Sequence, residues 1–237
     1  MAIFTRAIVG VLLAGAVCIS GCAKDAKPDA AAITKLPDSE VQSLNAQHAR
    51  FEKSEDPPIA AETRYAAGQL AESQRNPTTA IQQYREALKI QPNHLPSLFR
   101  LAVVYAQVGS YADAVATWQI YLKETNNDPV AWANLGFCHE LAGNTKEAEE
   151  AYQQGIAKDP KSNPCRVNYG LMLARAGRTT QAIIQLQAVL PEAQVHYNLG
   201  AIHEQQGHLA EAKAEYRKAM ELDPNLAEAK LRLAALD

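Results

Sequence analysis

Small residues recur at a nearly constant spacing from residue 61 to the end of this 237-residue chain, and no other feature constrains the fold as strongly. Successive members of the series are 34, 34, 34, 30 and 34 residues apart: Gly68, Ala102, Gly136, Gly170, Gly200 and Ala234. A second series keeps the same phase: Ala80, Ala114, Ala148, Ala182 and Ala212. A period of this length predicts stacked copies of one small structural unit.

The stretch from Pro129 to Pro160 indicates what one unit contains. Helical spacing places four residues on one face of a first helix: Trp132, Leu135, Gly136 and His139. Ala148 and Tyr152 share a face of a second helix, which Pro160 ends. We interpret Gly136 and Ala148 as small because the two helices cross closely there. Since each helix has one apolar face, the unit has to stack on its neighbours to bury that face.

These residues resemble the signature of the tetratricopeptide repeat (TPR) family: Trp132-x-x-Leu135-Gly136, Ala148-x-x-x-Tyr152 and Pro160. The resemblance implies an all-α fold, a right-handed α-solenoid of antiparallel helix pairs. It divides residues 61–226 into five repeats: 61–94, 95–128, 129–162, 163–192 and 193–226. Residues 227–237 are expected to form a C-terminal capping helix.

Helix ends support the same frame. Asn76, Asp128 and Asn163 each precede a proline, which predicts a capping side chain before the first helical turn. Four glycines are expected to end first helices in the left-handed conformation: Gly109, Gly143, Gly177 and Gly207. The period shortens by four residues after Ala182, which predicts a second helix about one turn short near Leu190.

The N-terminal residues have no place in the repeat frame. An apolar run that ends in Ile19-Ser20-Gly21-Cys22 predicts a signal peptide over residues 1–22. Its ending resembles a bacterial lipobox, which implies lipidation of Cys22, and Ala23 favours the outer membrane, facing the periplasm. The alternative is an ordinary secretory signal. Residues 23–37 are interpreted as a flexible tether, and residues 38–60 as a capping helix and loop over the first repeat.

Composition and motifs argue against several function classes. The net charge of −3 comes without a basic block, so no nucleic-acid partner is expected. The chain contains no sequence motif of a nucleophile, a metal site or a phosphate loop, so we expect no enzyme activity, cofactor, metal or small-molecule substrate. His139 and His203 occupy the repeat position of Tyr105 and are interpreted as packing residues. Cys138 and Cys165 are expected to be buried free thiols, because their helix positions lie too far apart for a disulfide.

The binding hypothesis concerns the first helices, which in TPR arrays line the concave side. Asn134, Asn168 and Asn198 occupy one repeat position, which Arg100 also occupies. Stacked amides can offer donors and acceptors to an extended peptide backbone. The predicted peptide-binding groove also contains Tyr65, Phe99, Val103, Phe137, Leu171 and Tyr197. Its rim is predicted at Glu72, Glu140, Glu204 and Arg175. The alternative is that asparagine is simply common at this position and that the aromatic residues support helix packing.

With a lipid anchor and a TPR array of this length, the chain resembles proteins of three bacterial groups. They are pilotins of type IV pili, the assembly lipoprotein of tight-adherence pili, and adaptors for peptidoglycan hydrolases or proteases. The resemblance implies a scaffold that binds extended segments of envelope proteins and assembles a pilus or secretion machine. An adaptor for hydrolases or proteases is one alternative, and a soluble interaction module without an anchor is another. A clamp for a C-terminal carboxylate is not expected in the groove, since the neighbours of the asparagines, such as Ala133 and Val167, are apolar.

Overall fold

The computed structural model describes Gln42 and residues 60–236. The chain divides into two units, residues 1–57 and 58–237, and every helix named below belongs to the second. The expected signal peptide, tether and N-terminal capping segment therefore lie outside the described residues, apart from Gln42 and Ala60.

The described part of the chain contains eleven helices and no strand, which confirms the prediction of an all-α fold. The first helices of the repeats are α2 (Ala61–Ser73), α4 (Leu95–Gln107), α6 (Pro129–Leu141), α8 (Asn163–Arg175) and α10 (Glu192–Gln205). The second helices are α3 (Pro77–Ile90), α5 (Tyr111–Glu124), α7 (Thr145–Lys158), α9 (Thr179–Gln187) and α11 (Leu209–Leu222). A last helix, α12 (Ala227–Leu236), follows them. Each predicted repeat contains one of these pairs, and α10 begins one residue before its predicted boundary.

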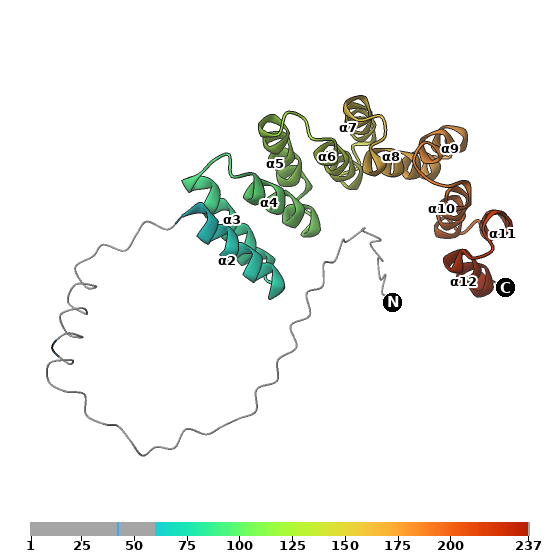
Figure 1. The fold of residues 1–237 in the computed structure, drawn as a ribbon, viewed down its shortest axis with the longest axis horizontal. Helices are drawn as coiled ribbons and strands as arrows, with labels where there is room; N and C mark the ends of the chain where they lie inside the picture. The colour runs from blue at the N-terminus through green and yellow to red at the C-terminus, as the bar shows by residue number, and fades with distance from the viewer. Residues whose placement is uncertain (1–41, 43–59, 237) are drawn as a thin grey trace, which may run out of the picture. The chain divides into compact units, whose positions relative to one another are not determined.

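The helices stack in chain order. Each first helix packs against the second helix of its own repeat, and that second helix packs against the first helix of the next repeat. Within this unit, Figure 1 shows the first helices along the inner side of an arc and the second helices along its outer side. The core is accordingly a run of apolar clusters, the largest of which extends from Ala148 in α7 to Ile202 in α10.

The glycines of the first helices lie against large side chains of the second helices. A Cβ atom added at Gly136 would lie 2.6 Å from the ring of Tyr152, and one at Gly200 would lie 2.7 Å from the ring of Tyr216. The short distance at Gly136 agrees with the predicted close crossing of the two helices, and the side chain nearest to Gly136 is Tyr152. The ring needs the space that a small residue leaves.

Two of the three predicted helix caps are present. The side chain of Asn76 accepts a hydrogen bond from the Thr79 N–H (3.1 Å), and the side chain of Asp128 accepts one from the Val130 N–H (2.9 Å). The prediction for Asn163 is wrong. Asn163 is the first residue of α8, and Ser162 precedes the helix without a capping side-chain bond. The N–H of Ser162 bonds to the carbonyl of Asp159 (2.9 Å) in the turn before this helix.

The turns inside the repeats share one backbone conformation. Gly109, Gly143, Gly177 and Gly207 have φ between 73° and 81°, which confirms their predicted left-handed conformation. In the first repeat the same position is occupied by Arg75, with φ of 56°. A side chain in this region costs about 1 kcal/mol or more relative to glycine, so Arg75 departs from the pattern at an energetic cost.

The second helix of the fourth repeat is shorter than the others. Helix α9 has 9 residues, whereas α3, α5, α7 and α11 have 14. The chain turns directly after it, since the N–H groups of Val189 and Leu190 both bond to the carbonyl of Leu186. The predicted shortening by about one turn is therefore confirmed.

Candidate protein-binding surface

The three asparagines lie on α6, α8 and α10, one per repeat, and we call them the asparagine ladder: Asn134, Asn168 and Asn198. Each precedes by two residues the glycine that faces the second helix of its repeat. Two residues turn a helix by about 200°, so the ladder faces away from the second helices and toward the inner side of the arc (Figure 1).

The ladder amides are not used within the fold. All three side chains are half-buried, and none of them has a hydrogen-bond partner among residues 60–236. A primary amide carries two donors and one acceptor group, and amides that water can still reach keep this capacity for a ligand. The ladder is therefore a row of unused hydrogen-bonding groups.

The two ends of this position in the array are different. Arg100 precedes the ladder, and its guanidinium forms an ion pair with Glu72, with Nε 2.9 Å from Oε1. Arg232 of α12 follows the ladder and pairs with Glu204 (3.4 Å). Arg100 is thus part of the packing between repeats.

The residues of the predicted rim have partners within the fold. Three glutamates of first helices share one pattern of contacts: Glu72, Glu140 and Glu204. Each accepts a hydrogen bond from a tyrosine in the second helix of its own repeat. Each also forms an ion pair with an arginine two helices further along the chain, on α4, α8 or α12. We call these sets charged clasps: Glu72 with Tyr84 and Arg100, Glu140 with Tyr152 and Arg175, and Glu204 with Tyr216 and Arg232. Because their partners already saturate these carboxylates, they join repeats and do not present free charge on a rim.

Burial sets the electrostatics of the charged clasps. Removal from water raises the pKa of Tyr84, Tyr152 and Tyr216 well above the usual range of a phenol, and the neighbouring carboxylates add to this effect. Burial also raises the pKa of Glu140, although Arg175 and the hydroxyl of Tyr152 oppose it. The phenols remain neutral donors, which suits a structural role.

Most of the predicted apolar groove residues pack within the fold. The ring of Phe99 makes edge contacts with the rings of Trp118 (5.0 Å between centroids) and Tyr121 (5.7 Å). Tyr65 lies against Tyr84 and His94, and Tyr197 lies against Tyr216. Val103, Val167 and Leu171 are partly buried against core clusters. These positions follow the packing alternative.

Phe137 differs from the other members of the apolar set. It is half-buried and belongs to none of the apolar clusters of the described residues. It lies three residues after Asn134 on α6, so the two side chains are neighbours on the helix surface. Of the predicted groove, the ladder and Phe137 are therefore the residues without a packing or hydrogen-bonding role among the described residues, although the other members are half-buried as well.

Among the described residues, His139, His196, His203 and both cysteines are buried or half-buried in the fold. His139 and His203 each bury Nδ1 without a partner among the described residues, and burial lowers the pKa of His139. His196 Nδ1 lies 2.6 Å from a carboxylate oxygen of Glu215. Both thiols are buried and unpaired, and burial raises the pKa of Cys138 to about 11.

Two further features concern the described residues as a whole. Between residues 60 and 236 no three His, Cys, Asp or Glu side chains gather in a way that could hold a metal ion. In the same part of the chain, no helix has the length and apolar character needed to cross a bilayer.

Comparison with known families identifies the architecture. Two family models, both described as tetratricopeptide repeat, match residues 66–136 and residues 129–162 and 193–226, and together they cover more than half of the chain. The chain belongs to the tetratricopeptide repeat family. Proteins of this family bind protein or peptide partners.

Solved TPR structures share the fold. MamA from Desulfovibrio magneticus RS-1 superposes with a TM-score of 0.56 at 20% identity, over 70% of this chain and 96% of that one. A TPR protein from Thermus thermophilus gives 0.54 at 19% identity, over 75% and 98%. YrrB, described as a TPR protein with an unusual peptide-binding site, gives 0.52 at 20% identity, over 78% and 96%.

Curated sequence relatives match this chain in part. Human tetratricopeptide repeat protein 7B is 29% identical over 105 residues, which are 44% of this chain and 12% of that protein. A probable biofilm formation methyltransferase, WspC from Pseudomonas putida, is 43% identical over 68 residues, or 27% of this chain and 16% of that protein. The chain therefore spans a small part of these two relatives.

Proposed function

We propose that this TPR protein is a scaffold that holds an extended segment of a partner protein along the asparagine ladder. The observation that carries the proposal is the set of three half-buried amides, one per repeat, without partners among the described residues. Each amide can donate to a backbone carbonyl and accept from a backbone N–H, so the ladder would recognise an extended backbone in preference to a particular sequence.

The spacing of the helices fits such a ligand. Packed helices lie about 8–10 Å apart, and an extended segment in the polyproline II conformation repeats its backbone orientation every three residues, or about 9 Å, so successive amides would meet every third residue of the ligand. Three amides would then span roughly seven residues of the partner. Phe137, beside Asn134, would contact one apolar side chain of the same segment.

We further propose that the scaffold is held at the outer membrane, facing the periplasm, by lipid on Cys22. Support for this comes from the sequence: the apolar run before Cys22 and the polar segment 23–37, which would separate the repeats from the membrane surface. In that setting the partners are envelope proteins, and the favoured role is assembly of a type IV or tight-adherence pilus or of a secretion system.

Two other settings remain as alternatives. A periplasmic adaptor for peptidoglycan hydrolases or proteases would use the same surface with different partners. A soluble interaction module would lack the lipid on Cys22. Nothing in the described residues favours either alternative over the pilus or secretion setting.

A photocrosslinking amino acid at Phe137 in intact cells tests the ladder. We expect crosslinks to a distinct partner that are lost in the triple variant Asn134→Ala/Asn168→Ala/Asn198→Ala. Helical content and the unfolding midpoint should not change, because these amides make no bond in the fold. The matched control replaces Asn93 and Asn225, which are exposed and lie in loops. Crosslinks that persist in the triple variant would disprove the ladder.

Metabolic labelling with a fatty-acid analogue tests the anchor separately. The wild-type protein is expected to incorporate the label and to fractionate with membranes, and Cys22→Ala is expected to lose both properties. Equal labelling of the two proteins would rule out lipidation at Cys22, and it would leave the ladder proposal intact.

A further inference from the structure

The turn between α2 and α3 carries the one described cationic side chain at a position where the other repeats have glycine. Gly109, Gly143, Gly177 and Gly207 present no side chain at this point, whereas Arg75 projects a guanidinium from the same left-handed conformation. Glycine is the favoured residue at this φ, so the backbone at Arg75 is strained. Backbone strain of this kind is characteristic of functional positions.

The Arg75 guanidinium is free of partners. No ion pair or hydrogen bond engages it among residues 60–236. The nearest carboxylate along the chain, that of Glu72, is saturated by the hydroxyl of Tyr84 and by two nitrogens of Arg100, and its side chain is only 14% exposed. The charge of Glu72 is thus neutralised by Arg100, and the positive charge of Arg75 is left unbalanced.

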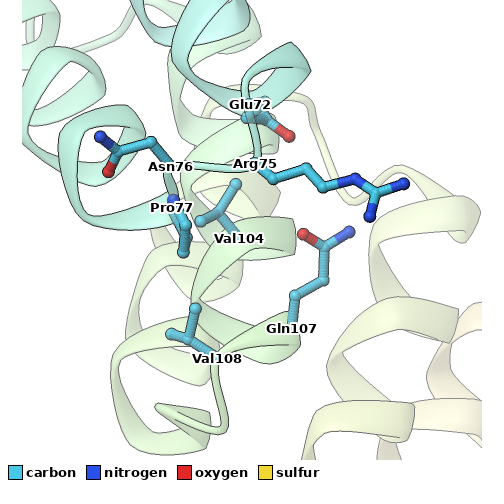
Figure 2. Close-up of a pocket in the computed structure, with 7 residues that line it drawn as sticks. All are labelled: Glu72, Arg75, Asn76, Pro77, Val104, Gln107 and Val108. Carbon is cyan, nitrogen blue, oxygen red and sulfur yellow. The ribbon is translucent and has the colours of Figure 1, made fainter.

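Arg75 lines a cavity of about 290 Å³ between the α2–α3 turn and the end of α4. Figure 2 shows its guanidinium and the amide of Gln107 extending toward the same side of this cavity. The Gln107 amide also has no hydrogen-bond partner among the described residues. Pro77, Val104 and Val108 form an apolar wall, to the left of these two polar groups in Figure 2.

The polar groups of Arg75 and Gln107 and the apolar wall together indicate the chemistry of a ligand. A guanidinium and an amide N–H can donate to the two oxygens of one carboxylate. The cavity has the volume of roughly ten waters, so it can hold an aliphatic stem or side chain against the valines as well as the acid. A phosphate fits this cavity less well than a carboxylate. Its negative charge is larger than the single positive charge of Arg75, the one unpaired cation among the described residues that line the cavity.

We propose that this cavity binds a carboxylate carried on an aliphatic residue of a partner protein, with Arg75 and Gln107 as donors to the acid. Two sources share this chemistry: a glutamate side chain within the partner and an apolar C-terminal residue with its free carboxylate. The cavity contains none of the ladder residues, so the proposal does not depend on peptide binding at the asparagine ladder.

Two pairs of short peptides are the probes. The first pair is blocked at both ends and carries an internal Leu-Glu or Leu-Gln step. The second pair ends in leucine with either a free acid or an amide. The measurement follows the side-chain N–H resonances of Arg75 and Gln107 in the ¹⁵N-labelled full-length chain. We expect one or both acids to shift these resonances with Kd on the order of 1 mM, and the neutral peptides to leave them unchanged.

The decisive variant is Arg75→Gly, followed through the Gln107 resonance. It should weaken binding of the responding acid about tenfold or more, which one charge-assisted hydrogen bond accounts for. It should also raise the unfolding midpoint, since glycine adopts this φ without strain. Loss of binding in a more stable protein cannot be caused by unfolding. Arg217→Ala, which removes an exposed arginine of α11, is the matched control and should bind like the wild type.

Each outcome is informative. A response to the internal glutamate assigns the site to a partner's acidic side chain, and a response to the free C-terminus assigns it to a chain end; both support the proposal. Equal responses to acid and neutral peptides, no response to either acid, or unchanged binding by Arg75→Gly would overturn it.

Discussion

Gly136 shows how a single missing side chain determines the geometry of a repeat. The ring of Tyr152 fills the space that a Cβ at Gly136 would enter, and the same ring donates its hydroxyl to Glu140 (3.3 Å). The glycine thus allows the aromatic ring to lie across the helix and reach the carboxylate one turn further along the same face. The small residue and the charged clasp depend on each other.

We predict that Gly136→Ala destabilises the protein by about 1–3 kcal/mol, the usual cost of overpacking a rigid core. Urea denaturation measures the change. Gly143→Ala is the comparison: a Cβ there meets nothing within 4 Å, so its cost comes from the positive φ alone. A loss below about 0.5 kcal/mol for Gly136→Ala would show that the Tyr152 ring can move aside.

The two repeat cysteines should be unreactive in the folded protein. Burial raises the pKa of the Cys138 thiol to about 11 and also raises that of Cys165, so the thiolate is scarce near neutral pH. With Cys18 and Cys22 replaced by serine, we expect slow reaction with a thiol reagent at pH 8 and two rapid equivalents in denaturant. Rapid native labelling would contradict the burial, and the absence of thiols after unfolding would indicate a disulfide.

At the scale of elements, the junction between the third and fourth repeats is the most heavily bonded. Besides the charged clasp of Glu140, it contains a second network on α7. Arg178 donates to both oxygens of Glu149 at 2.7 and 3.0 Å, and the hydroxyl of Tyr169 donates to the same carboxylate. This network joins α7 to α8 and to the turn before the short helix α9, so the repeat with the shortest helix is also held firmly at its start.

The Glu149 network predicts a pH dependence of stability. The hydrogen bond from Arg178, and then that from Tyr169, hold the pKa of Glu149 below the ordinary value of 4.5. A depressed carboxyl pKa stabilises the fold fully above the unfolded pKa, and that contribution is lost as pH falls through the folded pKa. The free energy of unfolding should therefore fall less steeply between about pH 5 and pH 3 in Glu149→Gln than in the wild type.

The control for this prediction is Glu150→Gln, the neighbouring residue on α7, whose side chain is largely exposed and pairs only with Lys146 at 3.9 Å. Its pH profile should match that of the wild type. Identical slopes for Glu149→Gln and the wild type would show that the network contributes nothing to acid unfolding.

At the scale of the whole array, the same repeat position has opposite environments at its start and in its interior. Leu70 of α2 is 60% exposed, while Ile202 at the matching position of α10 is 6% exposed. In the interior the preceding repeat covers this position, and no described residue does so for the first repeat. An array of this kind needs a different surface at its beginning.

The expected capping segment over residues 38–60 would cover Leu70, so we predict that Leu70→Ala costs about 2 kcal/mol in the full-length chain, near the ~2–4 kcal/mol expected for Ile202→Ala. Chemical denaturation of the two variants provides the comparison. A cost below about 0.5 kcal/mol for Leu70→Ala would show that α2 is uncovered and would contradict the capping segment.

The repeat period alone predicts the helices, the left-handed turns and the short α9, because each depends on local sequence. It does not predict which side chains fill the space between helices. The spacing places Phe99 and Tyr197 in the predicted groove, yet their rings contact Trp118 and Tyr216 of the second helices. These contacts depend on how the helices pack and cannot be predicted from the period. No role is predicted for Arg75 from the repeat period, although the sequence contains a signal: an arginine at a repeat position where the other repeats have glycine.

The charged clasps have a consequence for the effect of salt. Ion pairs join the first repeat to the second and the third to the fourth, and the fourth and fifth repeats share the largest apolar cluster. The junction between the second and third repeats is a smaller apolar cluster around Trp118 with no ion pair in the described part of the chain. This junction, between α5 and α6, therefore depends on apolar packing alone. High salt should weaken the junctions that contain ion pairs and leave this one unchanged.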